Sequence, residues 1–136
     1  MDINEIRDVF GKCEVFQGMD DSLIGLLLLT ANPVSFDEGQ TIYEKGEAAG
    51  GTFALIASGK ASAVAQSGFV VNELCTGEII GEVGTISQQA QRTLTIKALT
   101  PTRILQWDIE EVREKSPELI QKLKDLAWKR IKTCSE

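Results

Sequence analysis

Apolar and polar residues change their spacing along the chain from a helical period to a strand-like period and back again. Near the start, apolar positions recur every three or four residues, which is typical of amphipathic helices. We expect a short helix over residues 3–10, behind a capping-box pair formed by Asp2 and Glu5. A second cap signal at residues 20–22 precedes LIGLLLLTAN, which predicts another helix ending near Pro33.

From Val34 onward the pattern becomes that of strands separated by turns. Segments rich in Val, Ile, Thr and Phe alternate with glycine-bearing turns, and no long helical pattern lies between them. The candidate strands are PVSF, QTIYE, TFALIAS, KASAVAQ, FVVNEL, EIIGE, TLTIKAL and TRILQWDI. This pattern favours an antiparallel barrel or jelly roll over a parallel sheet, so we predict a mainly β fold.

The helical period returns after the last candidate strand. Asp108 precedes IEEVREK, with Glu111 in the capping-box position, and predicts a short helix. A final helix is expected from Pro117 to about Lys132, with its apolar residues on one broad side and Trp128 at the edge of that side.

The length and composition are those of one globular domain. A chain of 136 residues, 43% hydrophobic and 25% charged, is long enough to bury a core and too short for two ordinary domains. The longest apolar run, LIGLLLL, is far shorter than the ~20 residues of a membrane span. We expect a single domain over residues 1–136, with N-terminal helices at 1–32, a β-roll at 33–108 and C-terminal helices at 109–136.

The charge and the side-chain inventory argue against several classes of function. A net charge of -6 disfavours a nucleic-acid surface, because phosphate contacts require clustered Lys and Arg. The chain contains no histidine, the commonest general base and metal ligand, so we expect no enzymatic activity and no metal site. Three scattered cysteines and a first segment, MDINEIRD, without the features of a secretory signal lead us to expect a cytoplasmic location.

The stretch GEIIGEVGTISQQAQRTLTI contains the candidate chemistry. Glycines at 77, 81 and 84 indicate tight turns, whose backbone N–H groups can bind an anion. Arg92 can add charge-assisted hydrogen bonds to a phosphate, and Glu82 can accept hydrogen bonds from sugar hydroxyls. The residues therefore suggest a sugar-phosphate site, although the same spacing also suits an ion pair between Glu82 and Arg92 that closes a loop.

These residues resemble the cyclic nucleotide-binding domain family, which includes the bacterial catabolite activator protein and the regulatory subunits of cAMP-dependent kinase. GEVG and RTL match the phosphate-binding cassette of that family, with the ten-residue interval from Glu82 to Arg92 that bacterial members have. Turn glycines at 39, 46, 59 and 77 also match. The resemblance covers nearly the whole chain and implies an eight-stranded antiparallel β-roll, jelly-roll-like, flanked by short N-terminal helices and a C-terminal hinge plus helix.

The resemblance also implies roles for individual residues. Arg92 would pair with the cyclic phosphate, Glu82 would accept the ribose 2′-hydroxyl, and Trp128 on the final helix is a candidate lid. The rest of the anion site would consist of backbone N–H groups and one hydroxyl, from Gly81, Val83, Gly84 and Thr93. The chain departs from the family pattern at Leu94, which is usually alanine, and at Ile80, which is usually aromatic.

Two functions follow as hypotheses. The first is a non-enzymatic regulatory module that binds a cyclic nucleotide, cAMP in preference to cGMP, and signals through movement of its C-terminal helix. The alternative is a degenerate roll without ligand, in which Leu94 fills the site and the final helix serves protein interaction or dimerisation. In either case the partners would be a homodimer or another protein at that helix, with no nucleic acid and no membrane.

Overall fold

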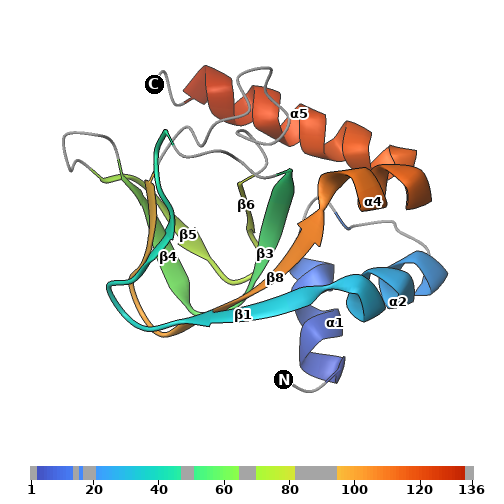
Figure 1. Ribbon diagram of the computed structural model, residues 1–136, viewed down its shortest axis with the longest axis horizontal. Coiled ribbons are helices and arrows are strands. Elements are labelled where there is room, and N and C mark those ends of the chain that lie inside the picture. Colours follow the sequence, from blue (N-terminus) through green and yellow to red (C-terminus); the bar gives the residue numbers. More distant parts are fainter. Residues whose placement is uncertain are drawn as a thin grey trace.

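The computed structural model describes residues 3–13, 16, 21–46, 51–64, 70–81 and 95–133. The described helices are α1 (Ile3–Lys12), α2 (Asp21–Thr30), α4 (Ile109–Lys115) and α5 (Pro117–Thr133). The described strands are β1 (Asn32–Phe36), β2 (Thr41–Tyr43), β3 (Thr52–Ser58), β4 (Lys60–Val64), β5 (Val70–Cys75), β6 (Ile79–Ile80), β7 (Thr95–Ala98) and β8 (Thr102–Asp108). These elements form a β-roll with helices at both ends of the chain (Figure 1).

The strands form two antiparallel sheets of four strands each. The order is β1-β8-β3-β6 in the first, called sheet 1 here, and β2-β7-β4-β5 in the second, called sheet 2. Neighbouring strands are often distant in sequence, since β1 pairs with β8 and β2 pairs with β7. The roll therefore forms only when both ends of the β region come together.

Between the two sheets lies a core of small and branched apolar side chains, called here the roll interior. Its buried members are Ile42, Tyr43, Ala54, Ile56, Ala61, Ala63, Leu74, Ile80, Ile96, Ala98 and Ile104. Strand alternation explains which residues belong to this core, because every second residue of a strand points to the same face. In β3, for example, Ala54 and Ile56 belong to the roll interior, whereas Phe53 and Leu55 belong to a different core.

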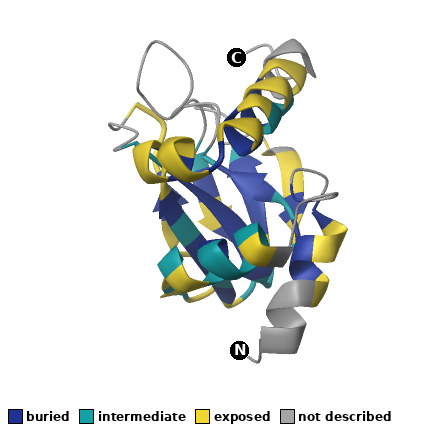
Figure 2. Cartoon of the chain, turned by 90° about the vertical axis from the view of Figure 1, so that its right-hand side faces the viewer, coloured by how far each residue is buried: buried dark blue, intermediate teal, exposed yellow. Residues whose placement is uncertain are grey.

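That second core lies between sheet 1 and the helices and is called here the helix-facing core. It contains aromatic residues from distant parts of the chain: Phe10, Phe16, Phe53 and Trp107. Phe10 and Phe16 meet edge to face with ring centroids 4.5 Å apart, and Phe53 stacks on Trp107 at 5.6 Å. The helices thus cover the outer face of sheet 1, and the buried strands lie beneath them (Figure 2).

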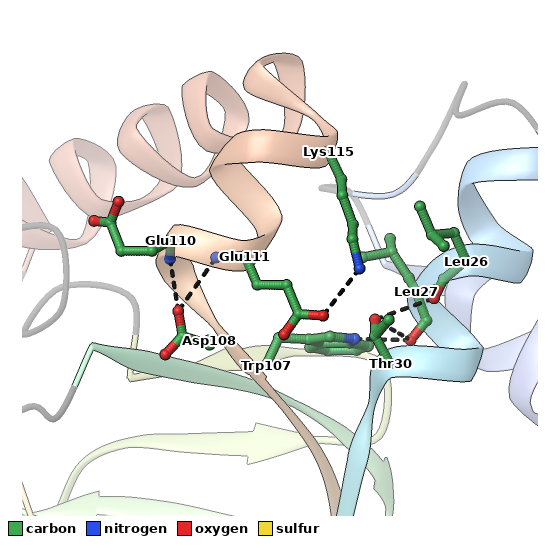
Figure 3. A network of polar contacts seen from close by, with 8 residues as sticks. All are labelled: Leu26, Leu27, Thr30, Trp107, Asp108, Glu110, Glu111 and Lys115. Atoms are coloured by element: carbon green, nitrogen blue, oxygen red, sulfur yellow. Dashed lines mark hydrogen bonds and ion pairs between the residues drawn. The ribbon is translucent and has the colours of Figure 1, made fainter.

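Two successive residues of β8 make hydrogen bonds that fix α2 and α4 to the strand (Figure 3). The buried indole N–H of Trp107 donates to the carbonyl of Leu27 in α2 at 2.8 Å. One residue later, Asp108 Oδ1 accepts from the backbone N–H groups of Glu110 and Glu111 at 2.9 and 3.2 Å, which caps α4. The strand therefore positions α2 with one residue and α4 with the next.

The predicted fold class is confirmed, and most predicted elements occur. TFALIAS is a strand over its whole length as β3, and Asp108 is the N-cap of α4 as expected. Among the described residues of EIIGE, predicted as one strand, only Ile79 and Ile80 form β6, because these two pair with β3, and Glu82 lies outside the described residues. The first helix extends to Lys12, beyond the expected end at Phe10. Asp2 of the first cap signal and Asp20 of the second, which spans residues 20–22, lie outside the described residues.

Candidate functional site

The candidate segment joins strands of different sheets. It leaves sheet 1 at Gly81, directly after β6, and enters sheet 2 at Thr95, the first residue of β7. The end of the roll that contains Gly81 and Thr95 is called the loop end here. The two ends of the segment are therefore held by different sheets, Gly81 by sheet 1 and Thr95 by sheet 2.

On the sheet 1 side, the approach to the segment is a rigid turn. The Gly77 N–H donates to the Ile56 carbonyl at 2.9 Å, and the Ile56 N–H donates to the Glu78 carbonyl at 2.9 Å. Ile79 and Ile80 are then almost completely buried. Gly81 follows with a φ of 82°, in the left-handed region that favours glycine. The chain therefore turns sharply where the predicted anion site begins.

On the sheet 2 side, Thr95 is fixed by a contact across the sheet. Its hydroxyl accepts a hydrogen bond from the backbone N–H of Lys45 at 3.1 Å. The sequence does not mark Thr95 for this role, because the two residues are 50 positions apart and come together only through the pairing of β2 with β7. No local sequence signal marks such a contact.

A row of residues crosses the inner face of sheet 2 beside the loop end. Asn72 of β5 pairs with Ala63 of β4, Ala63 pairs with Ile96 of β7, and Ile96 pairs with Tyr43 of β2. Ala63, Ile96 and Tyr43 are buried, whereas Asn72 is exposed. The buried residues of the row on β4, β7 and β2 are thus largely apolar, and the exposed residue on β5 is polar.

The predicted site residues divide into two groups. Gly81 lies in the described part of the chain, partly buried at the end of β6. The others lie outside the described residues: Glu82, Val83, Gly84, Arg92 and Thr93. Leu94, one of the two departures from the family pattern, also lies outside them, while Ile80, the other, is buried in the roll interior.

The candidate lid Trp128 lies on α5 and is largely exposed, with 64% of its surface accessible. The core-facing side of the same helix consists of Leu119, Ile120, Leu123 and Ala127, all buried. Trp128 is therefore at the margin of the packed face, as the helical periodicity predicts, and its ring is accessible to solvent.

Three further features concern the residues of the described ranges alone. No group of three or more His, Cys, Asp or Glu side chains there could hold a metal ion. None of the helices in that part of the chain has the length and apolar character needed to span a membrane. Cys75 is exposed and Cys13 is buried, and neither is part of a disulfide.

Comparison with known proteins assigns the family. The model of the cyclic nucleotide-binding domain family matches residues 33–116, which is more than half of the chain. A cGMP-dependent protein kinase of Eimeria tenella is 29% identical over 109 residues, which is 80% of this chain and 10% of the kinase. The chain thus spans about a tenth of the length of that curated relative.

Solved structures share the fold at lower identity. The cAMP-bound structure of PfPKA-R has a TM-score of 0.79 and 20% identity, over 95% of this chain and 43% of that one. The catabolite activator protein of Thermus thermophilus has a TM-score of 0.75 and 22% identity, over 89% of this chain and 59% of that one. With the family-model match, these results confirm the predicted family: the chain belongs to the cyclic nucleotide-binding domain family.

Proposed function

We propose that this chain is a non-enzymatic regulatory module that binds cAMP in preference to cGMP and signals binding by moving α5. The observation that supports it is the Gly-Glu-Val-Gly and Arg-Thr sequence between the end of β6 and the start of β7, in a chain of this family. The structure of PfPKA-R, which has the same fold, was solved with cAMP bound.

In this proposal the cyclic phosphate is bound by Arg92 and by backbone N–H groups in the turn that begins at Gly81. The guanidinium makes charge-assisted hydrogen bonds with the phosphate oxygens, and the left-handed backbone at Gly81 allows successive N–H groups to point at one anion. Glu82 accepts a hydrogen bond from the ribose 2′-hydroxyl, and Thr93 adds a hydroxyl to the phosphate site. The phosphate contacts together with the ribose contact of Glu82 give specificity for a cyclic phosphate joined to a ribose.

The route from this site to α5 runs through sheet 1. In β6, Ile80 belongs to the roll interior and Ile79 belongs to the helix-facing core, and both precede Gly81 directly. The helix-facing core also contains Leu119, Ile120 and Leu123 of α5. A shift of the chain at Gly81 on ligand binding therefore changes the surface on which α5 packs, and so changes the balance between two positions of the helix.

Isothermal titration calorimetry with cAMP and cGMP tests the binding proposal. We expect Arg92→Ala to weaken cAMP binding by about 2 to 4 kcal/mol, or about 30- to 1,000-fold in Kd, because it removes a charge-assisted pair from a largely desolvated phosphate. Arg103→Ala is the matched control, since Arg103 lies near the start of β8 and its Nε donates to Ser35 Oγ at 3.4 Å, away from the loop end.

Two outcomes would contradict the proposal in different ways. Absence of binding by the unmodified protein at millimolar cAMP and cGMP would refute ligand recognition and support the alternative role in protein interaction. The exposed Trp128 on α5 is the observation that favours that alternative. Equal affinities of Arg92→Ala and Arg103→Ala would leave ligand binding intact but remove Arg92 from the site.

A further inference from the structure

Lys60 and Cys75 lie directly opposite each other, in the last pair of the ladder between β4 and β5. Both residues are exposed. They lie on the outer face of sheet 2, because the next pair along the ladder, Ala61 and Leu74, belongs to the roll interior. Thr95 pairs with the last residue of β4, whereas Lys60 is the first, so the pair is at the end of the sheet opposite the loop end. An amine and a thiol are therefore neighbours on the surface, away from the proposed nucleotide site.

The backbone hydrogen bonds of the two residues bring their side chains close together. The Lys60 N–H donates to the Thr100 hydroxyl at 3.0 Å, and the Lys60 carbonyl accepts from the Leu99 N–H at 2.8 Å. The Cys75 N–H donates to the Glu78 carboxylate, and the Cys75 carbonyl accepts from the Glu78 N–H at 3.1 Å. Lys60 and Cys75 thus form a pair without hydrogen bonds between them, in which the Cα atoms are about 4.5 Å apart and the side chains are closest. Because the four-carbon stem of lysine is flexible, Lys60 Nζ can reach a group attached to Cys75 Sγ.

Neither side chain is engaged by the rest of the described structure. Among the described residues, none forms an ion pair or a hydrogen bond with the Lys60 amine or with the Cys75 thiol. Cys75 is a free cysteine, and it is exposed. Both groups are therefore accessible to a reagent from solution.

A thiol opposite an amine can transfer an acyl group to it, because cysteine is intrinsically a strong nucleophile. In the first step, Cys75 Sγ attacks the carbonyl carbon of an acyl thioester, the C–S bond of the donor breaks, and the donor leaves as a thiol with the proton from Cys75. In the second step, the neutral Lys60 amine attacks the carbonyl carbon of the Cys75 thioester. The C–N bond forms, the C–S bond breaks, and one proton passes from nitrogen to sulfur. One thioester and one amine give one amide and one thiol, without oxidation or reduction.

We propose that Lys60 is a site of modification by small acyl thioesters, with Cys75 as the nucleophile that first accepts the acyl group. The second step is fast because both reactants belong to one pair of residues, which makes the transfer intramolecular. The amide product has no positive charge, so acylation makes the net charge of -6 more negative by one. This inference goes beyond the proposed function and does not depend on nucleotide binding.

Incubation of the whole chain with acetyl-coenzyme A, followed by peptide mass spectrometry, tests the inference. Lys97 is an internal control, because it is exposed on the same outer face but pairs with Ser62 and Thr41 and not with a cysteine. We expect Lys60 to be acetylated about tenfold or more faster than Lys97 in the parent protein. The variant Cys75→Ser should lower the rate at Lys60 to that at Lys97 and leave the rate at Lys97 unchanged.

A second variant, Lys60→Arg, tests the intermediate. It keeps the positive charge but removes the acceptor amine, so the acetyl group should accumulate on Cys75 as a thioester that neutral hydroxylamine removes. Because both side chains are exposed, the two variants should unfold at the same temperature as the parent.

Two results would overturn the inference. One is an unchanged rate of acetylation at Lys60 in Cys75→Ser, which would show that the amine reacts with the donor directly. The other is the absence of a hydroxylamine-sensitive acetyl group on Cys75 in Lys60→Arg. Failure of the protein to bind cAMP or cGMP would refute the proposed function and leave this inference standing.

Discussion

Three turn glycines share nearly the same backbone conformation but differ in the space around them, which permits a graded test of the fold. Their φ angles are 86° at Gly39, 93° at Gly77 and 94° at Gly59. A Cβ at Gly39 would meet nothing within 4 Å, and one at Gly77 would lie 3.3 Å from Lys12 Cβ. At Gly59 it would lie 2.5 Å from the Pro101 carbonyl oxygen. Substitution by alanine therefore introduces nearly the same backbone strain at all three sites, with no clash at Gly39, a tight contact at Gly77 and a severe clash at Gly59.

The magnitudes follow from these distances. A positive φ costs an alanine about 1 to 2 kcal/mol, and this cost is common to the three variants. The contact at Gly77 adds only a few tenths of a kcal/mol, since Lys12 at the end of α1 has to shift by only a small distance. At Gly59 the clash is with backbone and with buried Thr102, whose hydroxyl lies within hydrogen-bonding distance of the Thr100 and Lys60 carbonyls, so overpacking adds about 1 to 3 kcal/mol. We expect Gly59→Ala to be destabilised by about 2 to 5 kcal/mol in total.

Urea denaturation followed by the fluorescence of buried Trp107 measures the free energies of unfolding. The effect of alanine on the unfolded chain is the same at each glycine, so the difference between Gly59→Ala and Gly39→Ala isolates the clash. Equal destabilisation of the three variants would refute the reasoning, because conformational strain alone would then account for every loss. Gly59 lies at the end of the roll opposite Gly81, so cAMP affinity should be unchanged in any of these variants that folds.

Two further predictions concern the C-terminal helices. Asp108→Ala removes the acceptor for Glu110 and Glu111 and should lower the free energy of unfolding by about 1 kcal/mol in thermal denaturation, whereas Asp108→Asn should cost less; equal losses would show that the cap bonds do not stabilise α4. Leu126→Ala loosens α5, where Leu126 is partly buried against the helix-facing core, at a cost of about 1 kcal/mol. If α5 reports ligand binding, the fluorescence change of Trp128 on cAMP addition should shrink while the calorimetric Kd stays the same; an unchanged fluorescence response would contradict signalling through α5.

The strands were predictable where their own residues determine them. TFALIAS reads as a strand because it is flanked by glycine and rich in apolar residues, and it forms β3 over its full length. Glu78 and Gly81 of the predicted strand EIIGE lie outside β6, because the length of that strand is set by its pairing with Ala54 and Leu55 and by the turn at Gly81. Alternation marks which residues share a face but does not identify the partner strand, so the sheet orders could not be predicted from the sequence.

The same distinction holds for the candidate site. The glycines, Glu82 and Arg92 are close in sequence and could be recognised as a motif. Asn72 and Thr95 could not, because their relevance depends on which strands are neighbours. Asn72 comes beside the loop end only through two successive strand pairings, β5 with β4 and β4 with β7. Residues that strand pairing brings to the loop end from distant parts of the chain carry no local signal.

Sheet 1 contributes side chains to two cores of different composition. Its outer face contributes Phe53 and Trp107 to the helix-facing core, where large aromatic contacts with the helices stabilise the fold. The roll interior instead contains four alanines, at positions 54, 61, 63 and 98, and of these Ala54 and Ala63 lie toward the loop end, where their small side chains leave space above the inner surface. Enlarging Ala63 should therefore interfere with a nucleotide at the loop end more than truncation in the helix-facing core does, while the truncation should cost more stability. Because β3 and β6 contribute to both cores, the proposed signal from the loop end to α5 requires only a displacement of sheet 1, and no contact between the nucleotide and the core of α5.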